Sequence, residues 1–413
     1  MRISRNLWLV SWTSLLNDIS SEMVYPLIGF FLTGSLGASP LVVGVIEGVA
    51  ESLASFLKIA SGWWSDRVRH RKWFAVAGYA ISVVGKALTA LAPAWGMVLA
   101  GRSLDKVGKG VRTAPRDALI AEEADGAHRG RAFGFHKAMD TTGAVFGVVI
   151  AFAALAYFGG SEEMVRRLMV AALLPSVLAI AVLMLVREQR RAASGESPAD
   201  GERNKGAGGW RPVRAWRELS GRLRVFYGLW FVFSLGASSD TFLFLWAHEL
   251  GASIPQVVLM YLVFNVVNAA TSEPAGRLSD RIGRRTVLTA GCVMYGAVYA
   301  GFALAGAFDA GLWALFVLFG LYGLQRALTD GVAKALVADL CPADAKATAL
   351  GLLDSLAGVG VLLASVVGGL LWERSGPEAM LWFGAGCGVF AGVMLPWTLG
   401  RRGTSGLQRA PGP

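Results

Sequence analysis

Charged residues are scarce in this 413-residue chain: Asp, Glu, Lys and Arg together make up 16% of it, whereas hydrophobic residues make up 54%. Soluble domains usually carry about 25% charged residues. A soluble protein of this composition would have to expose many apolar side chains to water, so the composition predicts that the bilayer is the solvent. We therefore expect an integral membrane protein.

Cysteine and histidine are also rare. The three cysteines, Cys292, Cys341 and Cys387, form no Cys-x-x-Cys pair, so neither a disulfide framework nor a zinc site is predicted. The four histidines show no metal-ligand spacing. The sequence also lacks a phosphate-binding loop that ends in Gly-Lys-Ser or Gly-Lys-Thr, which argues against direct use of ATP. We therefore expect no catalytic residues, no metal and no cofactor, and a protein that is not an enzyme.

The net charge of +10 does not indicate nucleic-acid binding, because the basic residues cluster in short loops between apolar segments. Basic clusters occur at 67–72, 187–222, 277–285 and 401–402. The alternate loops contain no Lys or Arg, at 34–40, 92–95 and 307–311. This alternation follows the positive-inside rule. It predicts a multi-pass protein of the plasma (inner) membrane, surrounded by lipid bilayer, with both termini in the cytoplasm and no nucleic-acid partner.

Twelve segments are long and apolar enough to span a bilayer, which takes about 20 residues. They lie near 7–33, 40–64, 72–94, 96–120, 131–158, 164–186, 224–249, 255–278, 286–308, 312–338, 346–372 and 379–400. The polar stretch between the sixth and seventh segments predicts a flexible linker. The expected domains are an N-terminal six-helix bundle over 1–186, a cytoplasmic linker over 187–222, a C-terminal six-helix bundle over 223–400 and a cytoplasmic tail over 401–413.

The two sets of six segments repeat. The tetrapeptide Leu-Gly-Ala-Ser occurs at 36–39 and again at 250–253, an offset of 214 residues. Gly, Ser, Asp and Arg at 62, 65, 66 and 67 recur at the same offset as Gly276, Ser279, Asp280 and Arg281. A constant offset over separate elements indicates a duplicated unit, with a substrate site between the halves near the midplane. The predicted fold is an all-α polytopic membrane protein of twelve transmembrane helices in two pseudo-symmetric six-helix bundles.

Two related loops follow the second and eighth predicted helices. They contain Gly62, Asp66, Arg67 and Arg71, and in the second half Gly276, Asp280, Arg281, Arg284 and Arg285. Each loop places an acid and several bases at the predicted cytoplasmic face. Such charges can pair with a neighbouring helix end in one conformation and release it in another. The alternative is that they are only positive-inside anchors, but an acid at the same place in both halves favours a conformational latch.

These loops resemble the signature loop of the major facilitator superfamily. The second copy, residues 276–285, matches the pattern G-x-L-x-D-R-x-G-R-R completely, whereas the first departs from it at Trp64, Arg69 and His70. Residues 102–110 are similar to the R-x-x-x-G-x-G-x-G segment that the family carries on helix four, with Lys106 in place of the first glycine. The resemblance implies two six-helix bundles and secondary active transport by alternating access.

Helix five adds a third match. Gly134, Gly143 and Gly147 are similar to the glycine ladder of the family's antiporters, with Val148 in place of that motif's proline. The resemblance therefore implies proton-coupled, drug-efflux-type transport. In the family the helix-four arginine is linked to proton coupling, and the matching residue in this chain is Arg102.

Several predicted helices carry ionisable residues at bilayer depth. The candidates for proton coupling or substrate binding are Asp18, Glu22, Glu51, Arg102, Asp105, Asp140 and Asp240. Each charge at the centre of a bilayer costs about 2.5–3.5 kcal/mol even on a lenient scale, and such residues are usually functional. On predicted helix four the polar residues recur at steps of three and four and form one stripe, which consists of Arg102, Asp105, Lys106, Lys109, Arg112, Thr113 and Arg116. These side chains are expected to face one another or a water-filled cavity.

A proton gradient could act through these charges. A carboxylate such as Asp18 or Glu22 would be ionised while it pairs with Arg102 or a substrate cation, and it would take up a proton when that partner leaves. The alternative is a buried salt-bridge network that only stabilises the N-terminal bundle, and this alternative is favoured for Glu47, Lys58 and Lys86. In the C-terminal half, Arg326 and Asp330 are expected to form an internal pair.

The sequence thus predicts a secondary active transporter that exports a small organic compound, with protons as the coupling ion. One alternative is an uptake symporter, or a carrier of organic anions or metal ions. The basic stripe suits an anion, whereas the carboxylates suit a cation. A second alternative is a membrane sensor or scaffold that transports nothing, which would have no water-accessible central cavity.

Overall fold

The computed structural model describes residues 4–65, 71–122, 129–187, 220–308, 311–341 and 346–398. This part of the chain is helical and contains no strand. The N-terminal half consists of α1 (Arg5–Val24), η1 (Tyr25–Leu27), α2 (Ile28–Phe30), η2 (Phe31–Ser35), α3 (Pro40–Ser65), α4 (Arg71–Ala90), α5 (Trp95–Glu122), α6 (Arg129–Phe158), α7 (Glu162–Ala171) and α8 (Leu173–Met184). The C-terminal half consists of α11 (Gly221–Gly236), α12 (Asp240–Glu249), α13 (Ile254–Ile282), α14 (Arg284–Ala307), α15 (Leu312–Leu340), α16 (Lys346–Ser375) and α17 (Pro377–Thr398).

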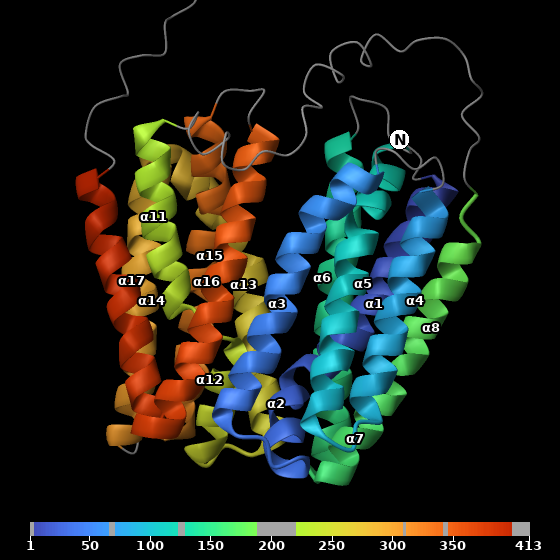
Figure 1. The fold of residues 1–413 in the computed structure, drawn as a ribbon, viewed down its shortest axis with the longest axis horizontal. Helices are drawn as coiled ribbons and strands as arrows, with labels where there is room; N and C mark the ends of the chain where they lie inside the picture. Colours follow the sequence, from blue (N-terminus) through green and yellow to red (C-terminus); the bar gives the residue numbers. More distant parts are fainter. Residues whose placement is uncertain are drawn as a thin grey trace, which may run out of the picture.

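The two halves stand side by side, as Figure 1 shows, and they diverge toward the end of the molecule at which the N-terminus lies. Ten stretches of the described helices are long and apolar enough to cross a membrane. Helices α1 and α5, of 20 and 28 residues, are as long but more polar. The expected all-α membrane fold of two helix bundles is confirmed. Most of the expected linker, residues 188–219, and the tail from 399 onward lie outside the described residues.

Three predicted helices are interrupted. The first ends as an α-helix at Val24 and continues through one 3-10 turn, which contains Pro26, and one π turn. The sixth breaks at Ala172, because the ring nitrogen of Pro175 cannot donate a hydrogen bond to the carbonyl of Ala171. The seventh breaks between Gly236 and Asp240, where a new helix begins with Ser239 as its N-cap. Broken membrane helices commonly border a binding site.

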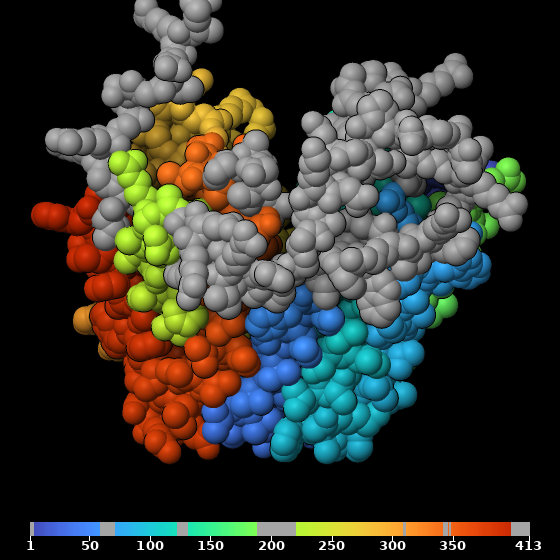
Figure 2. Space-filling view, turned by 45° about the horizontal axis from the view of Figure 1, so that its top comes forward, coloured from blue at the N-terminus to red at the C-terminus, as the bar shows by residue number. Residues whose placement is uncertain are grey.

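The halves meet where α3 packs against α16, and Figure 2 shows these helices in direct contact. Glycines allow their backbones to touch. A Cβ added to Gly369 would lie 2.6 Å from the Pro40 carbonyl oxygen, and one added to Gly44 would collide with the Ser365 carbonyl. One added to Gly48 would lie 3.0 Å from the Leu362 carbonyl. Small residues of this kind typically mark close helix packing in membranes.

A second glycine contact fixes the N-terminal half. A Cβ added to Gly143 of α6 would lie 2.5 Å from the Leu15 carbonyl oxygen of α1, and one added to Gly147 would lie 2.5 Å from the Ile19 carbonyl. Gly134, the first residue of the predicted ladder, has no neighbour within 4 Å of an added Cβ. Two of the three ladder glycines therefore hold α6 against α1, the helix that carries Asp18 and Glu22.

Candidate functional site

A cavity of about 880 Å³ lies between the two halves. Its walls come from α1, α4, α5 and α6 of the N-terminal half and from α13 of the C-terminal half. Figure 2, which brings the end with the N-terminus forward, shows a hollow between the halves there. All seven residues of the polar stripe on α5 line the cavity, namely Arg102, Asp105, Lys106, Lys109, Arg112, Thr113 and Arg116. Of the other candidates, Asp18, Glu22 and Asp140 also line it, and Glu51 and Asp240 do not.

Two stripe cations are neutralised by α3. The Arg102 guanidinium donates two hydrogen bonds to the Glu47 carboxylate, at 3.0 and 2.8 Å, and Glu47 is fully buried. One turn further on, Lys106 pairs with Glu51. Bidentate arginine–carboxylate pairs are among the strongest polar contacts in proteins. In this conformation Arg102 therefore has Glu47 as its partner rather than Asp18 or Glu22. The buried salt bridge that was expected for Glu47 is therefore present.

Lys86 and Arg112 have a different environment. The Lys86 ammonium donates to the hydroxyls of Ser20 and Ser176, both at 2.9 Å. The Arg112 guanidinium donates to the Ser82 hydroxyl at 2.5 Å and lies 4.6 Å from the centre of the Tyr79 ring. Within the described part of the chain neither cation has a carboxylate oxygen within 4 Å. Both side chains are buried and both line the cavity.

The carboxylates of α1 and α6 also lack a contacting Lys or Arg among the described residues. Asp18 accepts a hydrogen bond from the Asn17 amide at 3.2 Å. Glu22 accepts one at 2.7 Å from the Tyr261 hydroxyl, which belongs to α13 of the other half. Asp140 lies 3.6 Å from the His136 Nε2, and neither ring nitrogen of this buried histidine has a hydrogen-bond partner in the described structure. The carboxylates are thus held by groups that carry no permanent charge.

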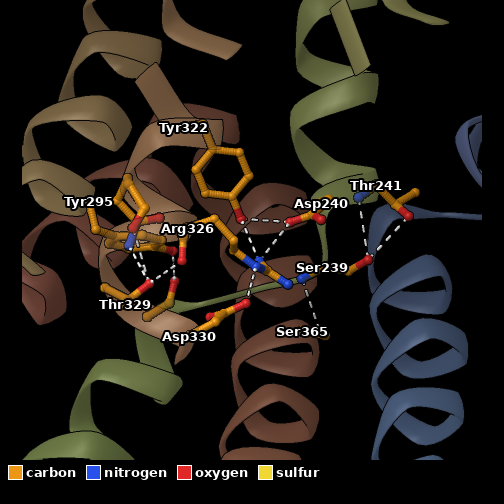
Figure 3. Close-up of polar contacts among 11 residues, drawn as sticks. Ser239, Asp240, Thr241, Tyr295, Tyr322, Arg326, Thr329, Asp330 and Ser365 are labelled. Carbon is orange, nitrogen blue, oxygen red and sulfur yellow. Dashed lines mark hydrogen bonds and ion pairs between the residues drawn. The ribbon is translucent and has the colours of Figure 1, made fainter. Parts of the chain in front are cut away.

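A second polar cluster lies in the C-terminal half, where α12 begins (Figure 3). The Tyr322 hydroxyl donates to the Asp240 carboxylate at 2.6 Å, and the Arg326 guanidinium lies 3.7 Å from the same carboxylate. Arg326 also donates to Asp330 at 3.2 Å, which confirms the predicted Arg326–Asp330 pair. Asp240 therefore has a cation beside it.

Glu22 and Asp240 occupy related positions in the two halves. Each follows two serines, in Ser-Ser-Glu at 20–22 and Ser-Ser-Asp at 238–240, and each accepts a hydrogen bond from a tyrosine. The difference is the nearby Arg326, since no Lys or Arg among the described residues contacts Glu22. Tyr261 and Tyr322 were missed as site residues, because nothing in a single sequence shows which tyrosine reaches a carboxylate on another helix.

The described part of the predicted latch forms contacts within the C-terminal half. Arg284 lies 3.5 Å from Asp280 and 2.7 Å from Asp339 at the end of α15, and Arg285 contacts the Pro396 carbonyl. Arg281 lies in the last turn of α13, one turn beyond Gly276. In the first copy Asp66 and Arg67 lie outside the described residues, as do the surroundings of Gly62, and Arg71 begins α4.

Comparison with known proteins agrees with this architecture. The family model "Major Facilitator Superfamily" matches residues 10–248 and 241–412. An uncharacterised MFS-type transporter of Methanocaldococcus jannaschii is 35% identical over 401 residues, 95% of this chain and 94% of that protein. The fosmidomycin resistance protein of Escherichia coli is 26% identical over 286 residues, 68% of this chain and 66% of that protein. The crystal structure of a mutant of the nucleoside transporter NupG superposes with a TM-score of 0.78 at 13% identity, over 96% of this chain and 100% of that one, a likeness of fold alone.

Proposed function

Because this chain belongs to the major facilitator superfamily of secondary transporters, we propose that it carries a small organic compound through its central cavity, coupled to protons. The observation that carries this proposal is the cavity itself. It lies between the two halves and is lined by ionisable residues at the depth of the membrane. Charged groups within a membrane are costly, and they usually mark a transport pathway or a proton relay.

Asp18, Glu22 and Asp140 are the proposed proton-binding groups. They line the cavity, and the groups that contact them are an amide, a phenol and an imidazole rather than a Lys or Arg. A carboxylate in such surroundings can lose its charge by binding a proton without leaving a partner cation unpaired. Glu47 and Glu51 lack this freedom, because protonation would leave Arg102 or Lys106 without its counter-charge.

Export and uptake are both consistent with this proposal, and a different observation supports each. Export is the direction predicted from the sequence, and the similarity to the fosmidomycin resistance protein of Escherichia coli supports it. The glycine ladder supports export less directly, because Gly143 and Gly147 have a packing role that any direction of transport would need. Uptake by symport is supported by the basic wall on α5, if the transported compound is an anion.

Vesicle transport tests the proposal. Right-side-out and inside-out vesicles that contain the protein would be given an imposed pH gradient, and the uptake of compounds from a metabolite and drug library would be followed by mass spectrometry. We expect at least one compound to accumulate only when the gradient is present, and to stop doing so after Asp18→Asn plus Glu22→Gln. Gradient-driven accumulation that persists unchanged in this double variant would refute the proposed proton-binding groups.

A further inference from the structure

The cavity contains two kinds of charge. Three ion pairs can first be set aside, because they are internally neutral: Arg102 with Glu47, Lys106 with Glu51, and Arg116 with Asp117 at 3.0 Å. Glu273 is likewise paired with Arg277. Three cations that contact no described carboxylate within 4 Å then remain on the cavity wall, together with four carboxylates, namely Lys86, Arg112 and Lys137, and Asp18, Glu22, Asp105 and Asp140.

These remaining charges are segregated. Arg112 and Lys86 lie on α5 and the adjoining α4, whereas the carboxylates Asp18, Glu22 and Asp140 lie on α1 and α6. There are two exceptions. Asp105 lies on α5 and attracts both Lys86 and Arg112 without contacting either within 4 Å, and Lys137 lies on α6 with Asp140. One wall of the cavity is therefore basic, with a single carboxylate among its cations.

Arg112 keeps its charge, whereas the carboxylates of α1 and α6 can lose theirs. An arginine stays protonated at any physiological pH. Arg112 is only 5% exposed, and the groups that contact it are a hydroxyl and an aromatic face. No carboxylate among the described residues contacts this buried cation, and an uncompensated buried charge is costly to maintain. The guanidinium has five N–H donors, so donors remain for a carboxylate, phosphate or phosphonate of a ligand.

We infer that the transported compound is an organic anion, and that Arg112 and Lys86 bind its negatively charged group. This inference rests on the proposed proton-coupled transport and specifies its substrate. The Ser82 and Ser176 hydroxyls accept hydrogen bonds from the two cations. When an anion binds, it can replace these hydroxyls as the acceptor, and the hydroxyls can then donate hydrogen bonds to the anion themselves.

The inference determines how protons and substrate are coupled. With all of these groups charged, three cations are opposed by four carboxylates, and protons on Asp18, Glu22 and Asp140 leave three cations against one carboxylate. Each proton thus favours anion binding, and by linkage the bound anion favours protonation to the same extent. Ligands that strengthen each other's binding travel together. An anionic substrate therefore selects proton symport over proton-driven export.

A series of probes that differ only in charge tests this inference. The full-length protein in detergent would be titrated with phenylphosphonate, benzoate, benzyl alcohol and benzylamine at pH 5.5 and 7.5, and binding would be read from the shift in its melting temperature. We expect the two anions to stabilise the protein more strongly at pH 5.5, and the alcohol and amine to have no effect. The charged groups of the cavity wall that could contribute to the pH dependence are Asp18, Glu22, Lys86, Arg102, Asp105, Lys106, Lys109, Arg112, Arg116, Lys137, Asp140 and Glu273. The titratable His136 contacts Asp140 from outside this lining.

Variants locate the binding site. Arg112→Gln and, separately, Lys86→Gln are expected to weaken the binding of the anionic probes at least tenfold, which corresponds to about 1.4 kcal/mol. Arg167→Gln is the matched control, because Arg167 is paired with Glu163 on the surface, is 70% exposed and does not line the cavity. Glu22→Gln, which imitates protonation, should raise anion affinity at pH 7.5 toward the value at pH 5.5.

The outcomes separate this inference from the proposed function. Three results would overturn the anionic assignment: benzylamine alone stabilises the protein, neither anion stabilises it, or the anions stabilise the wild type and Arg112→Gln equally. Each would do so even if vesicles show gradient-driven transport of some other compound. Anion binding that depends on Arg112, combined with transport that no pH gradient drives, would uphold the binding site and refute proton coupling.

Discussion

The Arg102–Glu47 pair gives the sharpest test of how the N-terminal half is held together. Replacing Glu47 by Gln would leave a buried guanidinium without a counter-charge. Loss of one partner from a buried ion pair typically costs about 3–5 kcal/mol. We expect about 3 kcal/mol for Glu47→Gln, because Arg102 also lines the cavity and water can reach part of it. The free energy of unfolding in mixed micelles, obtained by titration with sodium dodecyl sulfate, would measure this cost.

Replacing the other partner should have a different pH dependence. In Arg102→Gln the lone Glu47 is fully buried, but it can lose its charge by taking up a proton, whereas the lone Arg102 of Glu47→Gln cannot. The destabilisation by Arg102→Gln should therefore shrink as the pH is lowered, and that by Glu47→Gln should not. The double variant Arg102→Met with Glu47→Leu should be close to the wild type in stability, because it removes both charges together.

A matched surface pair completes this experiment. Arg167 and Glu163 form an ion pair at 3.0 Å on α7, with side chains that are 70% and 66% exposed. Exposed pairs contribute about 0–1 kcal/mol, so Arg167→Gln should change stability little. A cost below about 1 kcal/mol for Glu47→Gln, or a double variant as unstable as either single variant, would refute the reasoning that Arg102 needs Glu47 as its counter-charge.

Three further predictions follow from contacts elsewhere. Tyr261→Phe removes a hydrogen bond between the halves, and a hydrogen bond to a charged acceptor contributes about 1.5–3 kcal/mol. The distribution of distances between spin labels on the two halves should then broaden, and an unchanged distribution would argue that this bond does not hold the halves together. Gly143→Val should lower stability by several kcal/mol, because its side chain would press on the α1 backbone, whereas Gly134→Ala, which meets nothing within 4 Å, should be tolerated. Arg284→Gln should lower the free energy of unfolding by no more than about 1 kcal/mol, since Asp339 is 54% exposed. If the Arg284–Asp339 pair is a latch, the same variant should slow transport several-fold, whereas an unaltered rate would mean that the pair is only a surface ion pair.

Much of the membrane fold could be predicted from the sequence, because a bilayer requires long apolar helices and the repeated Leu-Gly-Ala-Ser and Gly-x-x-Ser-Asp-Arg segments reveal the duplication. The stripe on α5 was also predictable, since helical periodicity alone places its residues on one face. The breaks at Ala172 and near Ala237 were not predicted. Pro175 is a local signal for the first break, whereas the second depends on Ser365 of α16, whose hydroxyl accepts from the Ser239 amide at 3.2 Å.

The partners of the charged residues were harder to predict than their positions. Arg102 could have reached α1 or α3, and only the packing of α5 against α3 selects Glu47 over Asp18. The charge of Arg112 was visible in the sequence, but the nearby Tyr79 ring and Ser82 hydroxyl were not, because they lie on another helix. Periodicity shows which way a side chain points, and tertiary packing decides what it meets.

The contact between α3 and α16 has a consequence for leakage. Two backbones pressed together at glycines are held by short-range attraction, and a gap of about 0.5–1 Å already removes roughly a quarter to a half of it. A seal of this type has no stable half-parted form, so the passage on that side is either shut or fully parted. Small ions therefore find no long-lived opening between α3 and α16 during the transport cycle, and transport does not dissipate the membrane potential.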